Sequence, residues 1–86
     1  MDTKKIGMFL KNLRTENGMT QEQLGERIGV RNKTISRWKT GSYMPPVDSL
    51  KILSEIYQIS INEILCGERA SSEEFVEIAE QNIADA

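Results

Sequence analysis

The sequence predicts an all-α protein: a compact bundle of five helices with an additional amphipathic helix at the C-terminal end. Apolar residues recur at intervals of three and four through most of the chain, the spacing of one helix face. Thr20 and Ser60 are each followed three residues later by Gln or Glu, the capping box that begins a helix. Glycines follow several of the apolar segments, as they do where helices end. We therefore expect one domain over residues 1–67 and an acidic helix or linker over residues 68–86.

Composition narrows the classes of function. The chain has 86 residues, 38% of them hydrophobic and 28% charged, which suits one small folded domain. It contains one Cys and no His, which argues against disulfides, ordinary zinc sites and most nucleophile–base pairs. We therefore expect no metal, no cofactor and no enzymatic activity. No apolar run approaches the ~20 residues that cross a bilayer, so we expect no membrane contact from this segment and a cytoplasmic location.

The net charge of −2 hides a strong asymmetry. Residues 1–70 hold all eleven Lys and Arg against eight acids, whereas residues 71–86 hold five acids and no base. Binding to nucleic acid depends on a local basic patch and not on the total charge. The first 70 residues thus remain compatible with a nucleic-acid partner.

The first helix is expected from about Lys4 to Glu16, with Thr3 as its N-cap. Asn17 and Gly18 would end it. A second helix should begin after Thr20, which forms a capping box with Gln23, and end at Gly29. Its apolar stripe and that of the first helix consist of Ile6, Phe9, Leu10, Leu13, Leu24 and Ile28.

A third helix, expected over about residues 31–40, carries the residues that indicate a function. Ile35 and Trp38 form its apolar side, and we favour a core position for Trp38 over a stacking platform. Four cations occur within nine residues, with no acid among them, whereas the preceding helix mixes both signs as solvated faces usually do. One face combines an amide with cationic side chains, the types that read adenine and guanine edges in the major groove: Asn32, Lys33, Ser36 and Arg37.

The chain resembles the lambda-repressor-like helix-turn-helix family over roughly Lys4 to Leu65. The matching residues are Thr20-Gln21-Glu22-Gln23-Leu24, Gly29-Val30, Thr34-Ile35-Ser36-Arg37-Trp38, Gly41 and Pro45. The resemblance implies a five-helix domain whose third helix enters the major groove of double-stranded DNA. It also implies a sequence-specific transcriptional regulator, expected to be a repressor that binds as a homodimer.

The resemblance assigns base reading to Asn32, Lys33, Ser36 and Arg37. Gln21 matches the phosphate-contacting Gln of the family, at a helix N-terminus that favours anions. The remaining phosphate candidates are Arg14, Arg31, Lys39, Ser42 and Tyr43. Tyr43 could equally pack over the loop between residues 40 and 46.

Three positions depart from the family pattern. Gly25 stands where Ala is usual, so Gly25→Ala is expected to stabilise the helix by ~1 kcal/mol. Arg31 cannot act as a cap, so Asn32 could take that place and begin the helix one residue later. Lys39 stands where many members have an acid that pairs with Arg14. Without that acid, Arg14 and Lys39 are expected to turn to solvent or phosphate.

Two further helices are expected, from about Val47 to Tyr57 and after Ser60. Cys66 is interpreted as a small hydrophobe, because no activating partner is evident. The last segment carries apolar residues at helical spacing and acids mostly on the other side: Phe75, Ile78, Ala79 and Ile83, against Glu73, Glu77 and Glu80. The apolar stripe of residues 71–86 could fold back on the domain, pair with a second copy or begin a longer linker. We favour self-association or docking to a protein partner through these residues, and an antitoxin or adaptor is the alternative function.

Overall fold

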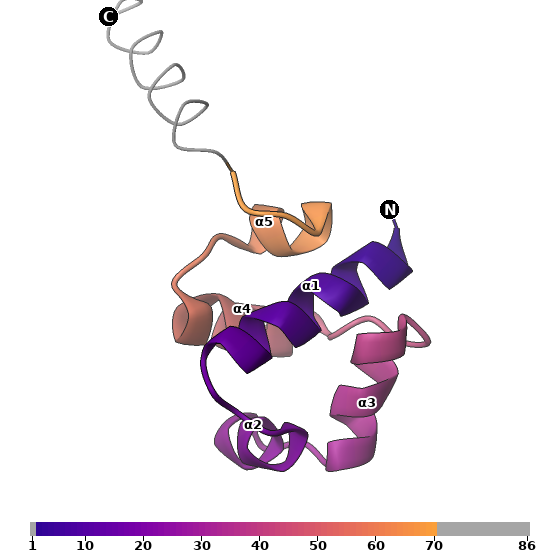
Figure 1. The fold of residues 1–86 in the computed structure, drawn as a ribbon, viewed down its shortest axis with the longest axis vertical. Coiled ribbons are helices and arrows are strands. Elements are labelled where there is room, and N and C mark those ends of the chain that lie inside the picture. Colours follow the sequence, from indigo (N-terminus) through magenta and orange to yellow (C-terminus); the bar gives the residue numbers. More distant parts are fainter. Residues whose placement is uncertain (1, 71–86) are drawn as a thin grey trace, which may run out of the picture.

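Five helices pack around one apolar core in the computed structural model, which describes residues 2–70 (Figure 1). The helices are α1 (Thr3–Glu16), α2 (Gln21–Ile28), α3 (Asn32–Thr40), α4 (Val47–Tyr57) and α5 (Ile61–Cys66). The predicted all-α class and the five helices are confirmed. The sixth helix expected within residues 71–86 lies outside the described residues. Within residues 2–70, no helix combines the length and the apolar character that crossing a membrane requires.

The capping signals set most helix boundaries as predicted. The Gln23 backbone N donates to Thr20 Oγ1 at 3.1 Å, and the Thr20 backbone N donates to Gln23 Oε1 at 2.9 Å. Ser60 and Glu63 form the same reciprocal pair at the start of α5. The predicted cap of α1 is wrong by one residue. Asp2, and not Thr3, is the N-cap, because its carboxylate accepts a hydrogen bond from the Lys5 backbone N at 3.0 Å. Its negative charge also interacts favourably with the positive end of the helix dipole.

The core is aliphatic with two aromatic members, and all five helices contribute to it. Its buried residues are Ile6, Leu10, Leu13, Leu24, Ile35, Trp38, Leu50, Leu53, Tyr57 and Ile64. Trp38 is 5% exposed, so the core interpretation is confirmed and the stacking alternative is wrong. Because Trp38 and Ile35 are both buried, the core fixes which side of α3 faces solvent.

The surroundings of Gly25 contradict the stabilisation expected from Gly25→Ala. A Cβ atom at this position would lie 2.5 Å from the backbone O of Val30. The Gly25 carbonyl oxygen also accepts from the backbone N of Gly29 at 2.8 Å and of Val30 at 2.9 Å. The chain therefore folds back directly over Gly25, and backbone atoms leave no room for a methyl group.

We accordingly expect Gly25→Ala to lower the melting temperature. The steric conflict should cost about 1–3 kcal/mol, more than the ~1 kcal/mol that alanine gains in helix propensity. Thermal denaturation followed by circular dichroism would measure the change. Glu26→Ala, at the next and exposed position, is the control and should alter stability by less than about 0.5 kcal/mol. A higher melting temperature for Gly25→Ala would contradict the observed packing.

Candidate nucleic-acid interface

α2 and α3 are joined by a three-residue turn that sets their mutual orientation. Gly29 adopts the left-handed conformation, with φ 79° and ψ 29°, and ends α2. Arg31 is the N-cap residue of α3, in an extended conformation. α2 and α3 are neighbours in the lower part of Figure 1, and α3 also packs against α1. This arrangement leaves one long side of α3 open to solvent.

The predicted base-reading residues lie on that open side. Asn32, Lys33 and Arg37 are exposed and Ser36 is half-buried. Ile35, at 4% exposure, points from the opposite side of the helix into the core. The structure therefore brings the four candidates together on one face that no described part of the chain covers.

The start of α3 decides the role of Asn32. Arg31 is the N-cap residue and makes no side-chain capping bond. Asn32 is the first residue of the helix, so the alternative in which it serves as the cap is wrong. Its side chain is thereby left available for contacts outside the domain. Arg31 is also exposed, beside the face that Asn32 and Lys33 share.

The loop after α3 folds back onto the last turn of the helix. The Arg37 carbonyl oxygen accepts from the backbone N of Ser42 at 3.0 Å and of Tyr43 at 3.4 Å. Thr40 Oγ1 donates to the same oxygen at 3.1 Å and lies 2.9 Å from Ser42 Oγ. These bonds hold the exposed side chains of Ser42 and Tyr43 close to the exposed face of α3.

The Arg37 side chain makes a cation–π contact that the sequence pattern did not predict. Its guanidinium carbon lies 5.3 Å from the centre of the Tyr43 ring, within cation–π range. Tyr43 remains 60% exposed, so the pair sits at the surface and not in the core. The ring limits the positions that the long Arg37 side chain can adopt. The loop conformation creates this contact, and no spacing pattern in the sequence indicates it.

Gln21 occupies the first helical position of α2, directly after the Thr20 cap. Its side chain is half-buried. The positive end of the helix dipole lies at this position, where it favours an anion. The geometry at the start of α2 therefore suits the expected phosphate contact.

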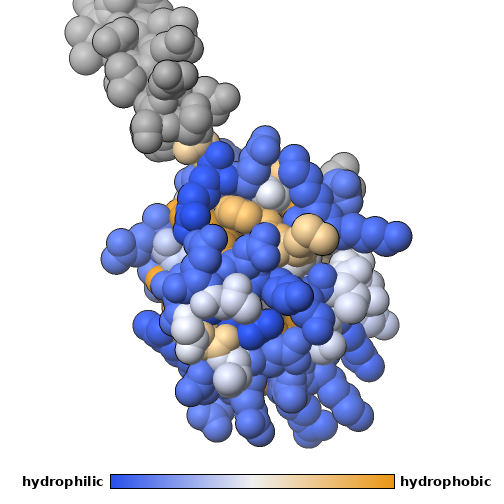
Figure 2. All heavy atoms as spheres, in the orientation of Figure 1, coloured by the Kyte–Doolittle hydropathy of each residue, from blue (hydrophilic) through white to orange (hydrophobic). Residues whose placement is uncertain are grey.

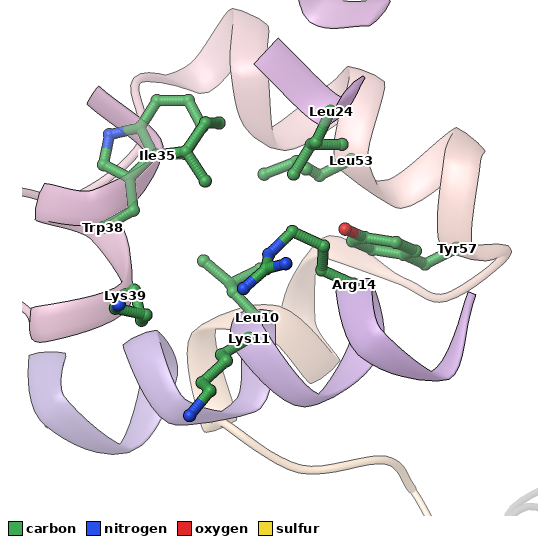
Figure 3. Close-up of a pocket in the computed structure, with 9 residues that line it drawn as sticks. All are labelled: Leu10, Lys11, Arg14, Leu24, Ile35, Trp38, Lys39, Leu53 and Tyr57. Atoms are coloured by element: carbon green, nitrogen blue, oxygen red, sulfur yellow. The ribbon is translucent and has the colours of Figure 1, made fainter. Parts of the chain in front are cut away.

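Arg14 does not turn to solvent, so the expectation that it contacts phosphate is corrected. Its side chain is buried, at 9% exposure, and Nη1 donates to the Met19 carbonyl oxygen at 2.8 Å. Figure 3 shows the guanidinium pointing into a small cavity of about 10 Å³ between α1, α2, α3 and α4. A backbone carbonyl has taken the role that an acid on α3 fills in many members of the family, and the side chain stays inside.

The charged side chains that line this small cavity are all positive. Arg14, Lys11 and Lys39 all line it, and none of its nine lining residues is an acid. Tyr57 also lines it, and within residues 2–70 its buried hydroxyl has no hydrogen-bond partner. Burial raises the pKa of Tyr57 to about 12, although the positive charges of Arg14 and Arg27 act in the opposite direction. Lys39 is half-buried, on the flank of α3 next to α1.

The described residues offer little else that could carry chemistry. Within residues 2–70, no three His, Cys, Asp or Glu side chains gather as metal ligands. Cys66 is exposed at the end of α5. The face shown in Figure 2 is mostly hydrophilic, with a small hydrophobic patch in its upper half.

Comparison with known proteins agrees with this geometry. A family model described as helix-turn-helix matches residues 10–64. The chain is 42% identical over 59 residues to the HTH-type transcriptional activator BcrR of Enterococcus faecalis, covering 69% of this chain and 29% of that protein.

Two further relatives cover more of the chain. It is 26% identical over 81 residues to the HTH-type transcriptional regulator ImmR of Bacillus subtilis, covering 94% of this chain and 64% of that protein. This chain is 32% identical over 69 residues to the cryptic phage CTXphi transcriptional repressor RstR of Vibrio cholerae, covering 80% of this chain and 61% of that protein. The chain thus spans less than two thirds of the length of these relatives.

Proposed function

Because this chain belongs to the helix-turn-helix family, we propose that it binds double-stranded DNA at specific sequences and thereby regulates transcription. The open, polar and basic side of α3 carries this proposal. A helix of this diameter fits the major groove, and the buried Ile35 and Trp38 hold the opposite side in place. Repression requires only that the bound domain covers a promoter, so we propose repression as its mode of action.

In the proposed complex, the exposed face of α3 reads bases and the surrounding residues contact phosphates. Arg37 donates to a guanine edge, and Lys33 and Asn32 contact bases nearer the N-terminus of α3, with Ser36 beside them. Gln21 contacts one phosphate strand from the start of α2. The remaining phosphate contacts come from side chains around the two ends of α3, namely Arg31, Lys39, Ser42 and Tyr43.

We further propose that two copies bind together. A single short helix reaches only about half of a recognition site. Two copies on neighbouring half-sites, about one helical turn of DNA apart, double the number of base contacts. The expected operator is therefore an inverted repeat, which selection of bound sequences from a random DNA pool would reveal.

Arg37→Ala tests the assignment of the base-reading face. We expect a loss of about 1–3 kcal/mol of discrimination at one base pair of each half-site, with little change in thermal stability because the side chain is exposed. Binding titrations against a set of single-base operator variants would measure it. Gln21→Ala is the matched comparison and should weaken all sequences alike. Equal weakening of all sequences by Arg37→Ala would refute its proposed role.

A further inference from the structure

A second basic feature lies away from the exposed face of α3. It is an open groove of about 440 Å³ between α1 and the end of α3, lined by Lys4, Met8, Lys11, Asn12, Lys39 and Thr40. Three of these six residues are lysines, and none is an acid. Met8 is an apolar side chain that is nevertheless 64% exposed. The groove therefore combines unneutralised positive charge with an uncovered apolar surface.

The described residues do not neutralise these lysines. Within residues 2–70, the ion pairs are Lys5 with Glu68 and Arg69 with Glu16, and neither pair includes a groove lysine. Phosphates would neutralise the charge of the groove but would not cover its exposed methionine. An acidic segment with an apolar side would do both.

Residues 71–86 of this chain have that chemistry. They contain five acids and no base, together with apolar residues at helical spacing: Phe75, Ile78, Ala79 and Ile83. As a helix, 16 residues would extend about 24 Å, longer than the ~12 Å that separate Lys4 from Asn12 along α1. The segment is thus long enough to cover the groove.

The residues that precede this segment are tied to α1 next to the groove. Glu68 pairs with Lys5 across 3.6 Å, and Arg69 pairs with Glu16 across 2.9 Å. Each residue advances about 100° around a helix, which places Lys5 and Glu16 on one flank of α1, beside Asn12. The Ala70 backbone N also donates to Glu63 at 3.0 Å. A segment that starts here needs to cross only one side of α1 to reach Met8.

We propose that residues 71–86 dock into the groove of their own chain, with carboxylates on the three lysines and apolar side chains on Met8. The tether supplies a high effective concentration, so a weak contact suffices. Docking brings up to five negative charges next to Lys39 and the end of α3. The docked segment would then compete with DNA phosphates, a consequence that rests on the proposed function, whereas docking itself does not.

Zero-length carbodiimide cross-linking of the full chain tests the docking without any DNA. The sample mixes unlabelled with ¹⁵N-labelled protein at low salt, and mass spectrometry identifies the linked peptides. We expect links from acids within residues 73–85 to Lys4, Lys11 and Lys39, joining residues of the same isotopic label. The exposed Lys33 and Lys51 are the internal comparison. Equal linking to those two lysines, or links only between differently labelled chains, would overturn the proposal.

Met8→Glu adds a variant with an intact fold, because the side chain is exposed. It should reduce the groove links several-fold through repulsion and loss of the apolar contact. Ile52→Glu, at an exposed position of α4, should leave them unchanged. Unchanged links in Met8→Glu would contradict the docking. A second outcome would also contradict it: no groove links form in the full chain, and a random DNA duplex protects Lys4 and Lys11 from acetylation. That outcome would assign the groove to nucleic acid.

Discussion

Gly7→Ala is expected to destabilise the domain by about 3 kcal/mol, because it would force apart α1 and α3. A Cβ atom at Gly7 would lie 2.4 Å from the backbone oxygens of both Lys39 and Trp38, and 2.9 Å from the Lys39 carbonyl carbon. These are backbone atoms of α3, so no side-chain rotation can relieve the overlap. A loss of this size is a large fraction of the 5–15 kcal/mol by which domains are typically stable.

Thermal denaturation followed by circular dichroism would measure this loss, and the direction of the shift is decisive. Helix propensity alone favours alanine over glycine by ~1 kcal/mol, so a helix free of contacts would become more stable. Thr15→Ser, at an exposed position of α1 outside the groove, is the control and should change stability by less than about 0.5 kcal/mol. An unchanged or raised melting temperature for Gly7→Ala would mean that α1 and α3 do not approach as observed.

Gly7 also illustrates what the sequence does not reveal. The helix boundaries were largely predictable, because Thr20, Ser60 and Gly29 act on backbone groups a few residues away. The close approach at Gly7 involves α3, which lies some thirty residues further along the chain. A glycine inside a helical pattern indicates only a lower propensity, and tertiary packing decides whether the absent side chain is required. The same reasoning explains the wrong expectation for Gly25.

In the candidate interface, too, some features follow from local sequence spacing and others depend on tertiary packing. The shared face of Asn32, Lys33, Ser36 and Arg37 follows from the helical period, so the sequence could predict it. The contact between Arg37 and Tyr43 depends on how the loop folds back. The position of Arg14 depends on the Met19 carbonyl and on a cavity built from four helices. Contacts of this kind are set by the packing of separate segments, which a single sequence does not specify.

Lys39→Glu is expected to shift thermal stability and DNA affinity in opposite directions. Arg14 is buried among cations in a pocket without an acid, and Lys39 lines the same pocket (Figure 3). A carboxylate at position 39 would remove one repulsive charge and offer the buried guanidinium an ion-paired hydrogen bond. Hydrogen bonds to charged groups contribute ~1.5–3 kcal/mol net. Because burying the new carboxylate is costly, we expect the free energy of unfolding to rise by about 1–2 kcal/mol.

The gain should depend on pH with a definite sign. An ion pair lowers the pKa of the introduced carboxyl group in the folded state below the ~4.3 of an unfolded Glu. The added stability is therefore present above about pH 4.3 and is lost as the pH falls through the folded-state pKa. Denaturant titrations at neutral and at acidic pH would measure both limits. Lower stability at neutral pH would show that Arg14 is not accessible to position 39.

The same substitution should weaken DNA binding more than tenfold at low salt, because a proposed phosphate contact is replaced by a repulsive charge. Lys39→Gln separates the two effects. It removes the cation without supplying a carboxylate, so it should weaken DNA binding while recovering only part of the gain in stability. Lys51→Glu, on α4, makes the same change in net charge at an exposed position outside the proposed interface. If Lys51→Glu weakened DNA binding as much as Lys39→Glu, net charge and not position 39 would account for the loss.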